Sequence, residues 1–187
     1  MRVLLGHSEG GLVALRATRS PKDICGLILV ASPGRPTGTI MRDQLRANPA
    51  NAPILDQATA AISELEAGRH VDAAKLNPAL GRLFRSNVQD FLINEMSLSP
   101  TSLIASYRGP VLILQGDKDI QVGVEDAQLL KKAKPDAEMT LLPGANHVLK
   151  LVPSDDRAAN IATYADPSLP LAPDITSAVA RFIKSGG

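Results

Sequence analysis

Three residues of this chain could together form a nucleophilic catalyst of the serine type: Ser8, Asp119 and His147. A serine hydroxyl is a weak nucleophile at neutral pH, so it needs a neighbouring base whose pKa lies near 7, which is the range of histidine. A carboxylate beside the imidazole would hold the required tautomer and stabilise the charged ring. Whether these side chains can meet depends on the secondary structure that precedes each of them.

Ser8 lies in the run G-H-S-E-G at 6–10, between a short apolar strand predicted at 2–5 and a helix predicted over 9–19. A serine on such a tight turn exposes its hydroxyl above the sheet, and glycines two residues to either side avoid collisions with neighbouring elements. The helix directs its first amides toward developing negative charge. We therefore predict that Ser8 is the nucleophile and that the backbone N–H of Glu9 is an oxyanion donor. The alternative is a structural serine in a glycine-rich turn.

Asp119 and His147 each follow a predicted strand as well. Apolar runs of strand length precede them at 111–115 and 138–142, and a third run at 26–32 completes a strand–helix–strand unit with the first strand. The ligand crevice of an open α/β sheet lies at the carboxyl ends of its strands. We therefore predict an α/β fold with a parallel sheet, whose carboxyl edge brings the three side chains together.

The segment between the second and third predicted strands has a different pattern. Three runs have the apolar spacing of helices, at 39–48, 54–68 and 79–97, and none has strand-like alternation. The predicted domains are a core formed by 1–35 and 109–187 and a helical cap over 36–108.

Taken together, these features resemble the α/β-hydrolase family. The matching stretches are "GHSEGG", "PVLILQGDKDIQV" and "GANHVLK", in the family's order of serine, aspartate and histidine, with a helical cap after the first. The tail is similar to that of bacterial serine esterases and serine aminopeptidase-like members. The family's G-x-x-D acid loop favours Asp119 over its neighbour Asp117. The resemblance implies cleavage of carboxylic esters through an acyl-enzyme, without a cofactor. The alternatives are a peptidase or amidase, and a catalytically silent binding module.

The resemblance also implies that the strands which precede the elbow strand in the family core are absent here. We expect either the C-terminal part of a longer hydrolase, or a natural short form that completes its sheet as a homodimer through the exposed strand Arg2–Leu5. The second oxyanion donor, which the family supplies from a loop after an early strand, then has no predicted source.

The other reactive side chains have plainer interpretations. His7 is expected to pack or form hydrogen bonds, and His70 to be a solvated residue near a helix end in the cap. Cys25 is the only cysteine, so an intrachain disulfide is excluded. Three histidines and one cysteine lack metal-ligand spacing, and there is no phosphate-binding glycine motif, so we predict no metal and no nucleotide cofactor.

Composition limits the partners. The chain has 187 residues, of which 44% are hydrophobic and 21% charged, and its net charge is +1. Such values are typical of soluble globular proteins, and the balanced charge argues against nucleic acid or an anionic membrane as the main partner. No apolar run is long enough for a membrane span, and no signal-peptide pattern begins at Met1. We expect a cytoplasmic protein that acts on a small-molecule ester or amide.

Overall fold

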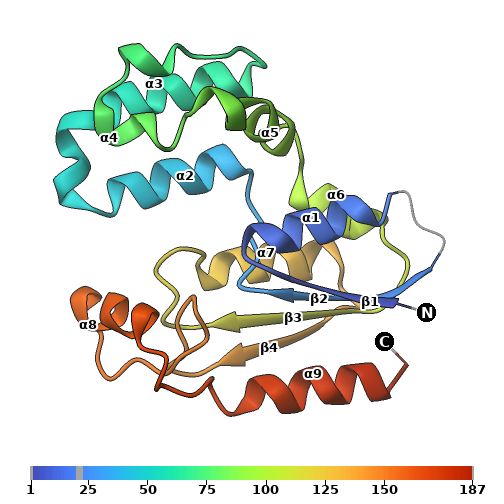
Figure 1. Cartoon of the computed structure of the whole chain (residues 1–187). Helices are drawn as coiled ribbons and strands as arrows, with labels where there is room; N and C mark the ends of the chain where they lie inside the picture. The colour runs from blue at the N-terminus through green and yellow to red at the C-terminus, as the bar shows by residue number, and fades with distance from the viewer. Residues whose placement is uncertain (1, 20–22, 187) are drawn as a thin grey trace. The chain divides into compact units, whose positions relative to one another are not determined.

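The structure is a computed structural model that describes residues 2–19 and 23–186. It consists of two compact units. One contains the residues up to Gly34 together with those from Pro100 onward, and the other is Arg35–Ser99. Figure 1 colours the chain by residue number, and each unit is described below by itself.

The first unit contains a parallel sheet. Its described strands are β1 (Arg2–His7), β2 (Ile24–Val30), β3 (Val111–Gly116) and β4 (Glu138–Leu142). They lie in sequence order, and each neighbouring pair is parallel (Figure 1). This confirms the predicted α/β fold class. The strand predicted at 26–32 in fact begins at Ile24 and ends at Val30, because Ala31 adopts a positive φ of 47° and turns the chain out of the sheet.

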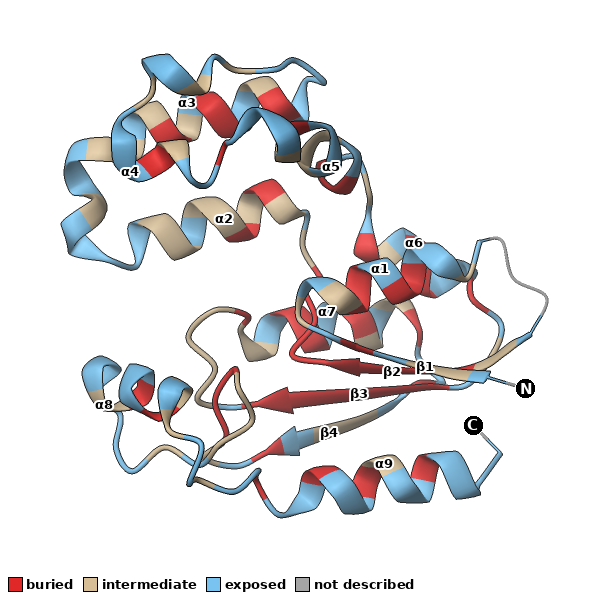
Figure 2. Cartoon of the chain, in the orientation of Figure 1, coloured by how far each residue is buried: buried red, intermediate tan, exposed pale blue. Residues whose placement is uncertain are grey.

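Helices cover both faces of this sheet. The first unit contains α1 (Glu9–Ala17), α6 (Pro100–Ser106), α7 (Val124–Ala133) and α9 (Asp174–Lys184). Beyond the carboxyl ends of the strands lie α8 (Arg157–Ala162) and a 3₁₀ turn η3 at Thr163–Ala165. Figure 1 places α1 and α7 on one face and α9 on the other. The two central strands, β2 and β3, are therefore buried on both sides, as Figure 2 shows. This explains why their sequences are continuous apolar runs without alternation.

The core between the sheet and α9 illustrates how alternate residues of a strand point to opposite faces. Its buried members are Ile28, Val30, Leu112, Leu114, Leu142, Ala145, Ala172, Ile175, Ala178 and Phe182. The intervening residues of the same strands, such as Leu29 and Ile113, are buried as well. Of the strands that precede the predicted catalytic residues, β3 is buried along its whole length, and it leads into the loop that carries Asp119.

β1 lies at one edge of the described sheet and is less buried than β2 and β3. Leu5 on β1 is 54% exposed, and Val13 on α1 is 52% exposed. An exposed apolar edge strand is a surface on which another strand can pair. Homodimerisation through Arg2–Leu5 stays a prediction.

The second unit is helical. Its elements are α2 (Thr37–Arg46), α3 (Leu55–Glu66), α4 (Pro78–Gly81) and α5 (Ser86–Met96), with 3₁₀ turns η1 (Pro49–Ile54) and η2 (Ala73–Lys75). The run predicted as one helix over 79–97 is divided into α4 and α5, because Arg85 has an extended backbone with φ −55° and ψ 142°. Phe84 and Met96 belong to the core of this unit. The action of the unit as a cap stays a prediction.

The two units also differ in extent from the predicted domains. The helix α6 belongs to the first unit, where it packs against α1 and α7, whereas the predicted cap continued to residue 108. No helix in the described parts of the chain is long and apolar enough to cross a bilayer.

Candidate active site

Ser8 stands at the turn between β1 and α1 in a backbone conformation that L-residues rarely adopt. Its φ is 54° and its ψ is −127°. Such backbone strain persists only where the surroundings enforce it, and it is common at functional sites. The Ser8 amide donates to the carbonyl of Val30 at the end of β2, and the Ser8 carbonyl accepts from the Gly11 amide, both at 2.9 Å. The chain therefore makes the strand-to-helix turn on which a nucleophilic serine is presented.

Two glycines allow α1 to lie close to the sheet at this turn. A Cβ at Gly6 would lie 2.2 Å from the Gly10 carbonyl oxygen, and a Cβ at Gly11 would lie 2.0 Å from the Ser32 hydroxyl. A Cβ at Gly10 would meet nothing within 4 Å. The expectation that both glycines of the G-x-S-x-G run avoid a collision is therefore wrong for Gly10. Gly11 has that role, because it is the residue of α1 that faces Ser32.

The difference between these glycines gives a matched pair of substitutions. Gly6→Ala should destabilise the protein by roughly 2–3 kcal/mol, the upper part of the range for an overpacked core site, because the new methyl group meets backbone that cannot move aside. Gly10→Ala should leave the stability unchanged or raise it by up to about 1 kcal/mol, because alanine is the better helix former. Urea unfolding of the two variants measures both effects. Equal stabilities would contradict the close approach at Gly6.

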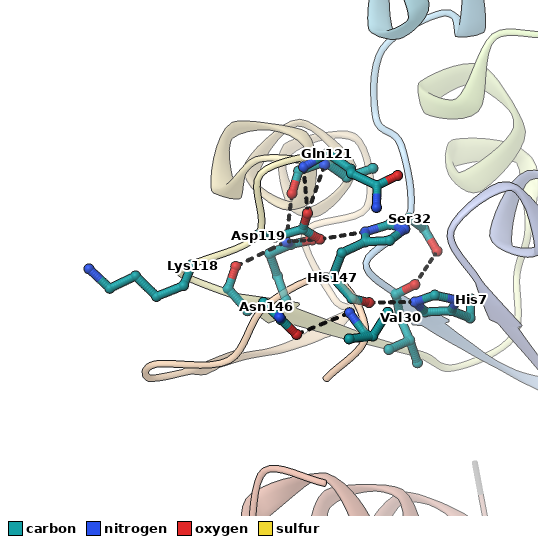
Figure 3. Close-up of polar contacts among 12 residues, drawn as sticks. His7, Val30, Ser32, Lys118, Asp119, Gln121, Asn146 and His147 are labelled. Carbon is teal, nitrogen blue, oxygen red and sulfur yellow. Dashed lines mark hydrogen bonds and ion pairs between the residues drawn. The ribbon is translucent and has the colours of Figure 1, made fainter. Parts of the chain in front are cut away.

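Asp119 and His147 are joined by a buried hydrogen bond at the carboxyl edge of the sheet. Nδ1 of His147 lies 2.8 Å from Oδ2 of Asp119, and their side chains are 7% and 0% exposed (Figure 3). When the carboxylate is ionised it only accepts hydrogen bonds, so in a neutral imidazole Nδ1 would carry the proton and Nε2 would hold the lone pair. This is the tautomer that a general base requires.

Three donors fix the carboxylate of Asp119. Its Oδ1 accepts the backbone amides of Gln121 at 2.8 Å and Val122 at 3.0 Å. Its Oδ2 lies 3.3 Å from the side-chain nitrogen of Gln115, which projects from β3. Because both of its oxygens are held, the carboxylate of Asp119 cannot rotate away from His147. The loop after β3 that carries Asp119, the acid loop, therefore fixes the orientation of the imidazole.

The structure separates the two aspartates of the acid loop. Oδ1 of Asp117 accepts the Gly144 amide at 2.7 Å and so ties the acid loop to the turn after β4. Asp119 faces His147 instead. Of the two aspartates weighed on sequence, Asp119 is the one beside the imidazole, and Asp117 is a turn residue.

His7 makes a second contact with the loop that follows β4 and carries His147, which is called the base loop below. Its Nε2 lies 2.7 Å from the His147 carbonyl oxygen, and the two ring centroids are 4.9 Å apart at an interplanar angle of 48° (Figure 3). The sequence predicted a packing or hydrogen-bonding role for His7, and the structure gives it both. Because His7 directly precedes Ser8, this contact brings the elbow and the base loop together.

The remaining predicted site groups are placed as follows. Within the described residues, the His147 ring is hydrogen-bonded to Asp119, and the Ser8 hydroxyl forms no hydrogen bond with that ring.

Glu9 is the first residue of α1, so its amide is one of the first-turn N–H groups that lack an intrahelical acceptor. His70 lies in the helical unit, where its Nε2 is 2.8 Å from Oδ1 of Asp90 in an exposed pair. The described residues contain no cluster of three or more metal-ligating side chains.

Gln115 and Asn146 are site residues that the sequence analysis missed. Gln115 donates to Asp119, and Asn146 lies directly before His147 and is fully buried. A signal for the first was present: an amide side chain interrupts the apolar strand V-L-I-L-Q-G just before the acid loop. A buried polar group needs partners, so it points to a polar cluster at the end of that strand.

Comparison with known proteins identifies the family of this chain. Residues 2–163 match the model of the alpha/beta hydrolase family, and the chain belongs to that family. A curated relative, Lipase 1 of Psychrobacter immobilis, is 24% identical over 170 residues. That alignment covers 85% of this chain and 54% of the relative, so the chain spans about half the length of the lipase.

Solved structures have the same fold at low sequence identity. A putative non-heme bromoperoxidase, BpoC from Mycobacterium tuberculosis, superposes with a TM-score of 0.55 at 15% identity, covering 99% of this chain and 67% of that one. Est1E from Butyrivibrio proteoclasticus, in a structure with bound ferulic acid, has a TM-score of 0.52 at 20% identity, covering 98% and 59%. An alpha/beta hydrolase from a metagenome of Mar Chica lagoon sediments has a TM-score of 0.53 at 17% identity, covering 98% and 61%.

Proposed function

We propose that this chain carries the catalytic triad of a carboxylic ester hydrolase, with Ser8 as nucleophile, His147 as general base and Asp119 as the acid. The observation that carries the proposal is the buried 2.8 Å hydrogen bond between Asp119 and His147. The strained turn at Ser8 adds to it, because the same sheet edge holds both. Membership in the alpha/beta hydrolase family and similarity to a lipase favour an ester over other acyl substrates.

The proposed reaction has two halves. In the first, Nε2 of His147 takes the Ser8 hydroxyl proton as the oxygen attacks the ester carbonyl, and the imidazolium then protonates the departing alcohol. In the second, His147 takes a proton from water as the water oxygen attacks the acyl-enzyme, and the imidazolium then returns that proton to Ser8 Oγ as the bond to the acyl group breaks and the carboxylic acid is released. The Glu9 amide would donate to the oxyanion in both halves. Asp119 keeps the imidazole in its tautomer and stabilises its charged form.

The proposal is tested by hydrolysis of p-nitrophenyl butyrate by the purified chain. We expect saturable turnover with a burst of nitrophenol, which reports the acyl-enzyme. If the chain cleaves aminoacyl p-nitroanilides faster than the ester, the activity is that of a peptidase or amidase and the proposed esterase activity is wrong. A folded chain that cleaves neither substrate would favour the silent binding module.

A further inference from the structure

One segment that follows β4 contacts both loops of the acid–base pair. The helix α8 and the turn η3 supply Asn160 and Thr163, which are 4% and 5% exposed and meet the fully buried Asn146. The side-chain nitrogen of Asn146 lies 2.6 Å from the Thr163 hydroxyl oxygen and 3.2 Å from Oδ1 of Asn160. Polar groups that are buried this far from solvent are costly unless they are paired, so this cluster is a specific arrangement.

The side-chain oxygen of Asn146 accepts hydrogen bonds within the base loop itself. Oδ1 accepts the backbone amides of Val148 at 3.2 Å and Lys150 at 3.1 Å. The loop thereby closes around Leu149, which adopts a φ of 64°. Every hydrogen-bonding position of the Asn146 side chain is thus filled, two of them by the segment and two by the base loop. His147 lies inside this loop, so its backbone position depends on Asn146.

Asn160 reaches the acid loop from the same cluster. Its side-chain nitrogen donates to the Lys118 carbonyl at 2.7 Å, and Lys118 directly precedes Asp119. One segment therefore contacts the residue before the base and the residue before the acid. The Thr163 hydroxyl, which donates to the Asn160 carbonyl at 2.7 Å, joins these contacts into one network.

We propose that Asn146, Asn160 and Thr163 are positioning residues that set the hydrogen bond between Asp119 and His147. The inference rests on the proposed function for its effect on catalysis, but the hydrogen bond itself can be observed without catalysis. Loss of one member leaves buried partners unpaired, and the two loops then lose their common support. Misplacement of a catalytic group by about 1 Å is enough to cost on the order of 10²-fold in rate.

The test is Thr163→Val, which keeps the branched shape and removes the hydroxyl. The first readout is the downfield proton resonance of His147 Nδ1–H, identified by its loss in Asp119→Asn. The second is ester hydrolysis. We expect the resonance to shift or broaden, and kcat to fall about tenfold or more with little change in KM, because substrate contacts are untouched. Thr163→Ser, which restores the hydroxyl, should recover both. Ile161→Ala, an exposed site in α8, serves as the control that leaves both unchanged.

The two readouts separate the inference from the proposed function. If the wild type shows the resonance but no ester hydrolysis, its loss in Thr163→Val still supports positioning, and the proposed function fails alone. An unchanged resonance and kcat in Thr163→Val would overturn the inference. A wild type without the resonance would overturn it too, since there would be no bond to position. If Thr163→Val does not fold, Asn160→Ala takes its place, because alanine favours helix α8 and removes the contact to Lys118.

Discussion

Ser8→Ala should reduce ester hydrolysis on the order of 10³- to 10⁶-fold, the range seen when a triad nucleophile is removed. The substitution deletes only the hydroxyl oxygen, so the attacking atom is lost while the Cβ and the turn are kept. Alanine and serine both carry a Cβ, so the φ of 54° imposes the same backbone strain on either residue. We therefore expect an unchanged urea midpoint, with KM close to that of the wild type. The measurement is the initial rate on p-nitrophenyl butyrate beside an unfolding curve.

Ser32→Ala is the matched control for this loss. Ser32 is buried near the same turn, and its hydroxyl donates to the Val30 carbonyl at 3.2 Å. Loss of this hydroxyl should change the rate by less than about tenfold. Ser32 packs against Gly11 of α1, and its hydroxyl takes no part in the proposed chemistry. Equal losses in Ser8→Ala and Ser32→Ala would mean that the rate reports the integrity of the turn. Retained hydrolysis in Ser8→Ala would contradict its assignment as nucleophile.

Asp119→Asn should lower kcat on the order of 10⁴-fold, as in other serine triads, because the wrong tautomer of the histidine is then favoured. The asparagine oxygen can still accept the amides of Gln121 and Val122, so its NH₂ group is turned toward Nδ1 of His147. Nδ1 must then accept, and the ring proton moves to Nε2, which can no longer act as base. The pH–rate profile and kcat on a nitrophenyl ester measure this effect.

Asp117→Asn is the corresponding control. The side-chain oxygen of asparagine can accept the Gly144 amide as Asp117 does, so the turn is kept. We expect kcat within about threefold of the wild type, since a neutral acceptor loses only part of one charge-assisted hydrogen bond. A larger loss in Asp117→Asn than in Asp119→Asn would reverse the choice between the two aspartates.

The sequence predicted the part of the site that depends on strand order. Each of Ser8, Asp119 and His147 follows an apolar run, and parallel strands end at the same sheet edge. The pairing of Asp119 with His147 follows from that topology, although the residues are 28 positions apart. The parallel sheet was also predictable, because β2 and β3 are buried on both faces and so lack polar alternation.

The sequence could not predict features that depend on distances between elements. Gly10 and Gly11 are adjacent glycines, and the sequence does not show which of them must lack a side chain. The close approach of α1 to Ser32 shows that it is Gly11. The contacts of Asn146 with Asn160 and Thr163 join positions whose segments have no periodic pattern. The division of the 79–97 run follows from the backbone at Arg85, which apolar spacing does not report.

The most direct test of the central claim is the site of covalent labelling by a fluorophosphonate probe. An activated serine reacts with this electrophile, whereas an ordinary serine hydroxyl at neutral pH does not. The labelled protein is digested, and the modified peptide is identified by mass spectrometry. The account predicts one adduct, on Ser8, which disappears in both Ser8→Ala and His147→Ala. A folded wild-type chain that remains unlabelled, or one labelled at another serine, would contradict the claim that Ser8, His147 and Asp119 form a working triad.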